Sequence, residues 1–79
     1  MKQPILWKNE IVGFVEDMKV DMFDLYGKWI PANTIATSNF INFLIQGEIL
    51  WIKVGEHIDG TIEFIPDDTI NIKLRPFKD

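Results

Sequence analysis

The chain has 79 residues, no cysteine and a net charge of −4. This length suits a single domain over residues 1–79, whose core must be stable without disulfides. Acidic surfaces repel phosphate backbones, and no stretch approaches the roughly 18 apolar residues of a membrane span. We therefore expect a cytoplasmic protein that binds neither nucleic acid nor membrane.

Alternation of apolar and polar residues predicts strands along most of the chain. We expect a strand over residues 5–8, a turn at 9–10, and a second strand from residue 11 to about 16. Alternation continues to Met22, so the second strand is either one long bent strand or two strands broken near its middle. Gly13 is a candidate for a bulge or for a close approach of another segment.

The best turn signal is Asp24-Leu25-Tyr26-Gly27, in which Asp and Gly occupy the first and fourth positions of a type I turn. This turn should join a strand over residues 18–23 to a short strand over residues 28–30. Pro31 should end that strand, because proline has no N–H for the ladder.

Residues 39–46 break the alternation. Their apolar residues recur at spacings of three and four, which predicts a helix of about two turns. Ser38 is a suitable N-cap, and Gly47 follows where a glycine in the left-handed conformation ends many helices.

The remaining residues again alternate. We expect a strand over residues 49–54, a loop over 55–60, and strands over 61–65 and 69–74 that are joined by a turn at 66–68. The clearest alternation in the chain lies in the last of these strands.

The predicted fold is therefore mainly β, with about five to seven short antiparallel strands and one short helix. The sheet either curls under the helix or closes into a small barrel, and its outline resembles small SH3-like barrels in a general way. The side chains predicted to form the core are Leu6, Val12, Phe14, Met18, Val20, Met22, Phe40, Leu44, Leu50, Ile52, Val54, Ile62, Phe64, Ile70, Ile72 and Leu74.

Few residues indicate chemistry. His57 is the single histidine, flanked by Glu56 and Asp59, and the single serine, Ser38, is better used as a helix cap. The acids between residues 17 and 24 do not have the spacing of a calcium loop. We expect no catalytic residue, no metal site and no cofactor. We therefore expect that the protein is not an enzyme.

Outward aromatic side chains with neighbouring acids indicate a surface that binds a protein. Trp51 shares a strand with Leu50 and Ile52 but has the opposite parity, so it should face solvent; in the first strand, either Trp7 or Leu6 is core. We expect a non-catalytic module that binds a protein partner, possibly a basic one, similar by analogy to small acidic immunity-type inhibitors. The predicted partner-binding residues are Trp51, Trp7, Tyr26, Asp21, Asp24 and Glu63.

Two alternatives and one further expectation remain open. A carbohydrate or small ligand could stack on Trp29 near Asn33, or on Trp51 near Asn71. An enzyme could use His57 as a general base. In any of these cases an open sheet edge could also form a homodimer.

Overall fold

The computed structural model describes residues 2–63 and 68–74. These residues form the elements β1 (Lys2–Trp7), β2 (Glu10–Asp21), β3 (Asp24–Pro31), α1 (Ile35–Ile45), β4 (Leu50–Val54), β5 (Ile58–Ile62) and β6 (Thr69–Leu74). The strands close into an antiparallel barrel in the order β1-β2-β3-β6-β5-β4, with β4 paired to β1. The prediction of a small SH3-like antiparallel barrel with one short helix is confirmed.

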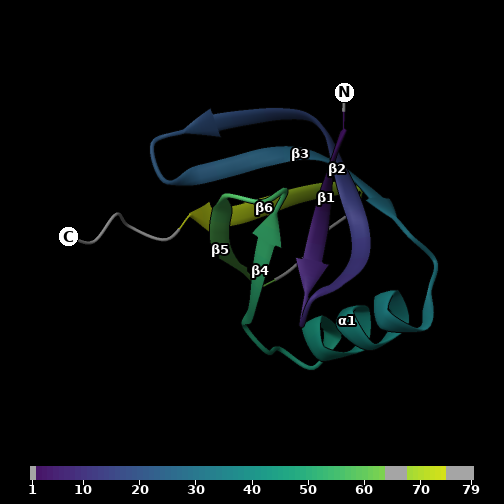
Figure 1. Cartoon of the computed structure of the whole chain (residues 1–79). Helices are drawn as coiled ribbons and strands as arrows, with labels where there is room; N and C mark the ends of the chain where they lie inside the picture. The colour runs from purple at the N-terminus through teal and green to yellow at the C-terminus, as the bar shows by residue number, and fades with distance from the viewer. Residues whose placement is uncertain (1, 64–67, 75–79) are drawn as a thin grey trace.

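Two three-stranded meanders make up the barrel. The first is β1-β2-β3 and the second is β4-β5-β6, and the two are joined through β1 with β4 and through β3 with β6. Helix α1 connects the meanders and lies across one end of the barrel (Figure 1).

Helix α1 begins earlier than its apolar spacing predicts, because Thr34 and not Ser38 caps it. The Thr34 hydroxyl accepts a hydrogen bond from the backbone N–H of Thr37 at 3.1 Å, and the Thr37 hydroxyl accepts one from the N–H of Thr34 at 3.2 Å. This capping box satisfies two N–H groups that the helix itself cannot. At the other end, Gly47 has a φ of 91°, as expected of a glycine after a helix.

The core is organised around Phe40, which is fully buried. The Phe40 ring centroid lies 5.7 Å from that of Trp7 and 5.9 Å from that of Trp29. Trp7 is only 9% exposed, because Phe40 and Phe43 of the helix pack against it, and the rest of its surface lines a pocket shared with Trp51. Its place in a binding surface stays a prediction. Of the two alternatives for the first strand, Trp7 is core, and Leu6 is only half-buried on the opposite face.

Two bulges in β2 change which residues face inward. For this reason, simple alternation assigns some residues of this strand to the wrong face of the sheet. Val12 is the extra residue of the first bulge opposite β1. After it, Val15 is fully buried, whereas Phe14 is only half-buried. The second bulge lies between Glu16 and Lys19. Despite both bulges, β2 is one continuous strand.

The glycine beside the first bulge allows a close approach, as predicted. A Cβ atom on Gly13 would collide with the ring of Trp29 and would lie 2.7 Å from the carbonyl oxygen of Ile30. The missing side chain therefore lets the Trp29 ring pack directly against β2 and reach Phe40.

The first hairpin turn is one residue earlier than predicted. Lys8 and Asn9 form it, with φ values of 54° and 66°, and Glu10 already pairs with Trp7. Left-handed conformations at both positions are what a tight two-residue hairpin loop requires.

The predicted turn at Asp24–Gly27 is wrong. The chain reverses at Met22 and Phe23, and Asp24 is already paired with Asp21 as the first residue of β3. Gly27 serves a different purpose there, because a Cβ atom on it would collide with the side chain of Val15. Because Gly27 has no side chain, Val15 can pack against it. Gly27 is therefore needed for packing and not for a turn.

The second meander follows the predictions more closely. Strand β6 covers residues 69–74 as expected, and β4 begins at residue 50. The predicted loop over residues 55–60 is shorter, because β5 starts at Ile58. Residues 64–67, with the end of a predicted strand and most of a predicted turn, lie outside the described residues.

Most of the predicted core is confirmed. Val12, Phe40, Leu44, Leu50, Ile52, Val54, Ile62, Ile70 and Ile72 are buried, whereas Leu6, Phe14, Met18 and Leu74 are half-buried, and Phe64 lies outside the described residues. Val20 and Met22 were predicted as core but are 57% and 82% exposed, because they lie toward the tip of the β2–β3 hairpin. The core residues that alternation missed are Ile5, Trp7, Val15, Leu25 and Trp29.

Truncating the central aromatic should show how far the fold depends on it. We expect Phe40→Ala to lower the free energy of unfolding by about 3–5 kcal/mol, because it leaves a cavity between two tryptophans. Urea denaturation followed by tryptophan fluorescence measures this loss. Ile45→Ala on the same helix is the control: Ile45 is 77% exposed, so it should change stability by less than about 0.5 kcal/mol. Equal effects of the two variants would contradict this view of the core.

Candidate functional site

Trp51 is exposed on the outer face of β4, as its parity predicted. Leu50, Ile52 and Val54 point into the barrel, whereas Trp51 is 58% exposed. An indole this exposed is unusual for so large an apolar group, and it offers a flat surface for binding.

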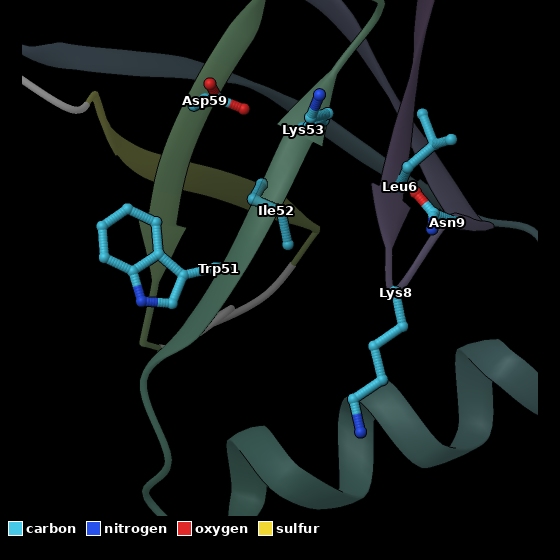
Figure 2. Close-up of a pocket in the computed structure, with 7 residues that line it drawn as sticks. All are labelled: Leu6, Lys8, Asn9, Trp51, Ile52, Lys53 and Asp59. Carbon is cyan, nitrogen blue, oxygen red and sulfur yellow. The ribbon is translucent and has the colours of Figure 1, made fainter.

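A surface pocket of 360 Å³ lies between β4 and the β1–β2 turn. Figure 2 shows its lining residues, which are Leu6, Lys8, Asn9, Trp51, Ile52, Lys53 and Asp59. The Lys8 side chain bends toward α1 in this view, and its ammonium lies 4.8 Å from the Trp7 ring centroid and 5.9 Å from that of Phe43. Its charge therefore stabilises the contact between the turn and the helix through cation–π attraction.

A second pocket adjoins the first at Lys8 and Trp51. It has a volume of 440 Å³ and is mostly apolar, with Phe43 from α1 and Ile49 before β4 among its lining residues. Ile49 is 57% exposed and Phe43 is 38% exposed. Apolar side chains are thus exposed on both sides of the gap between α1 and β4.

The predicted acidic residues come together elsewhere, where the β2–β3 hairpin lies beside β6. The Asp24 carboxylate forms an ion pair of 2.7 Å with the ammonium of Lys73. The hydrogen bond and the charge of Asp24 raise the pKa of Lys73, and Glu63 adds to this. Asp21 accepts a hydrogen bond from the hydroxyl of Tyr26.

The Tyr26 hydroxyl is partly desolvated and lies near negatively charged side chains. Its pKa is raised above the ordinary value, first by desolvation and then by the charges of Asp21 and Asp24, with Lys73 opposing them. At the Tyr26 hydroxyl, the charges of Asp21 and Asp24 therefore outweigh that of Lys73.

The structure thus separates the predicted binding residues into two groups. Asp21, Asp24, Tyr26 and Glu63 act on one another around Lys73. Trp51 belongs to β4, and two other strands, β5 and β6, lie between β4 and the strand of Tyr26.

Sequence reasoning missed the exposed residues between the two hairpin aspartates. Met22 is 82% exposed and Phe23 is 56% exposed, and Met22 has a φ of 57°. Glycine is the usual residue at the first position of a tight turn with positive φ, so methionine is strained there. Neither residue type marks a turn, and no signal in the sequence would have placed one here.

The other candidate residues do not assemble into a site. His57 is exposed in the turn before β5, beside Gln3 and Pro4, whereas Ser38 lies in the first turn of α1. Trp29 is 7% exposed, so its predicted use as a stacking surface is wrong. Asn71 lies on β6 and does not line the pocket beside Trp51, where Asn9 takes its place.

The described part of the chain has neither a cluster of metal ligands nor a membrane-spanning helix. No group of three or more His, Cys, Asp or Glu residues could hold a metal ion, as far as residues 2–63 and 68–74 go. Within the same residues, no helix is long and apolar enough to cross a membrane.

Comparison with known proteins found no match to this chain among protein-family models, curated proteins or solved structures.

Titration of the single tyrosine tests the electrostatics of the acidic cluster. We expect the phenol of Tyr26 to ionise above its ordinary pKa of 10.0, and Asp21→Asn to lower that pKa by removing a negative charge beside the hydroxyl. Because the raised pKa favours the protonated folded state, its contribution to stability is present below pH 10 and is lost as the pH rises through the folded-state pKa.

The absorbance of the phenolate reports this one group directly, since the chain has only one tyrosine. Asp59→Asn removes the same charge from β5, away from Tyr26, and should leave the titration unchanged. A wild-type pKa at or below the ordinary value would show that the acidic cluster does not form.

Proposed function

We propose that this protein is a non-catalytic module that binds a basic protein partner through the tip of the β2–β3 hairpin. The single observation that supports this most strongly is the exposure of Met22 and Phe23 between the two paired aspartates Asp21 and Asp24. Large apolar side chains at the centre of a patch, with charged groups at its rim, are the usual composition of a protein interface.

Two further features support the same surface. The tight turn gives Met22 a φ of 57°, which methionine adopts only with strain, and such strain is often found at functional positions. Desolvation raises the pKa of Tyr26, and the charges of Asp21 and Asp24, next to the tip, raise it further against that of Lys73. These two carboxylates would speed the approach of a positively charged partner and orient it.

Binding measurements with hairpin variants test the proposal. A tagged protein captures its partner from native lysate, and calorimetry then measures the affinity of the purified partner for each variant. We expect Phe23→Ser to weaken binding at least about tenfold through loss of an apolar anchor. Asp21→Asn should weaken binding less, and should reduce its dependence on salt.

Ile45→Ser is the control, because it removes an exposed apolar residue from the helix, away from the hairpin. It should bind like the wild type. An acidic captured partner, or full affinity of both hairpin variants, would exclude the hairpin tip as the binding surface.

A second candidate function is the binding of a carbohydrate beside Trp51. It is favoured by the pocket that combines this exposed indole with hydrogen-bonding side chains of Asn9, Lys53 and Asp59. Sugars stack on flat aromatic rings and need such polar neighbours. A glycan array would show binders that Trp51→Ala loses; an array without binders would dismiss this function.

A further inference from the structure

Lys8 lies where three surface pockets meet. It lines both pockets beside Trp51 and a third pocket of 440 Å³ against α1. The second and third pockets also share Trp7 and Phe43, and the second, which contains Ile49, is called the Ile49 pocket. Figure 2 shows the Lys8 side chain bending toward α1. The charge of this one residue is therefore common to all three pockets.

The Ile49 pocket has the size and composition of a small-molecule site. Five of its lining residues are apolar and two are charged: Trp7, Phe43, Ile49, Leu50 and Trp51, with Lys8 and Glu48. Its volume of 440 Å³ is in the range of sites that combine apolar walls with a few charged or polar groups. Ile49 and Trp51 are both more than half exposed, so an apolar ligand would remove a large apolar area from water.

The Lys8 ammonium is available to a ligand. It has no acidic partner among the residues that the structure describes, and lies 4.8 Å from the Trp7 ring centroid and 5.9 Å from that of Phe43. Of the three pockets, Glu48 lines only the Ile49 pocket and Glu10 only the third, whereas Lys8 lines them all. A cationic ligand would therefore meet Lys8 wherever it lay, and an anionic one would gain a charge-assisted hydrogen bond.

The backbone of Lys8 also departs from what its turn favours. Lys8 has a φ of 54° in the first position of the two-residue loop between β1 and β2. Asparagine, aspartate and glycine usually fill this position, because they adopt positive φ with the least strain. Such strain is often found at ligand-binding positions, and here it lies at the residue that the three pockets share.

We infer that the Ile49 pocket binds a small amphipathic carboxylate. The apolar chain or ring of the ligand packs against Phe43, Ile49 and Trp51, and its carboxylate pairs with the ammonium of Lys8. The apolar walls select the body of the ligand, and the one cation that is free of an acidic partner selects its head group.

This site is independent of the two functions proposed above. Its lining residues lie on β1, α1 and β4 and next to these elements, and none of them is at the tip of the β2–β3 hairpin. A carbohydrate beside Trp51 would instead use Asn9, Lys53 and Asp59, which line the neighbouring pocket and not the Ile49 pocket.

The test titrates the wild-type protein with decanoate and follows the three indole N–H resonances by NMR. We expect those of Trp7 and Trp51 to shift, whereas that of Trp29, which does not line the pocket, should move much less. Decanoate should bind about fivefold more tightly than octanoate, because two further methylene groups leave water. Decanol, which has the same chain and no charge, should bind more weakly than decanoate, and decylamine should bind most weakly.

Substitutions at one position separate the charge of Lys8 from its packing. Lys8→Met keeps an unbranched apolar chain but no charge, so it should weaken decanoate binding by about tenfold and leave decanol binding unchanged. Lys8→Arg keeps the charge and should bind decanoate within about threefold of the wild type. Lys28→Met is the matched control, because it removes the same charge from an exposed position on β3, opposite Glu16, and should bind like the wild type.

Several outcomes would overturn the inference. Tighter binding of decylamine than of decanoate would show that Glu48 selects the ligand, and full affinity of Lys8→Met for decanoate would show that Lys8 does not. A dimer by light scattering that Trp51→Ala dissociates, together with no binding of decanoate, would show that a second copy occupies the pocket. Circular dichroism checks that the variants are folded, and the comparison of head groups in the wild type decides the question without them.

Discussion

The packing of Phe40 between Trp7 and Trp29 is the interaction on which the rest of the structure depends. One ring comes from the helix, one from β1 and one from β3, so a single cluster joins the connection between the meanders to the first of them. Several local features serve it. Gly13 has no side chain where the Trp29 ring lies, and the hydroxyl of Thr37 donates a hydrogen bond to the carbonyl oxygen of Val12 at 2.8 Å. A chain of this length without disulfides needs such large buried rings.

Closure of the barrel determines where a partner can bind. A closed barrel removes most edges, and the helix covers one end, so the available features are the outer faces, the turns and any strand that extends beyond its neighbour. Strand β2 has 12 residues and β1 has 6, and this difference leaves the distal part of β2 without a second neighbour. The outer face of that edge carries one charge of each sign, from Lys19 and Asp21.

Some elements could be predicted because their information is local. The inward face of β4 follows from Leu50, Ile52 and Val54, since a strand without bulges keeps strict alternation. Strand β6 follows for the same reason, and Gly47 ends the helix through its own conformational freedom. The candidate site was predicted only in part. The acidic residues and Tyr26 lie close together, but Trp7 is not part of that group.

The amino-acid sequence by itself determined that the fold is mainly β, with short antiparallel strands and one helix, because hydrophobic periodicity depends on neighbouring residues alone. Closure of the sheet into a barrel was decided by the pairing of β4 with β1, which the tertiary structure shows. Only the tertiary structure decided which tryptophan is buried, where β2 bulges, and that Met22 and Phe23 form a turn instead of continuing the core. Each of these depends on strand register. One extra residue moves every later side chain to the other face of the sheet, and the pairing partner that sets the register lies elsewhere in the chain.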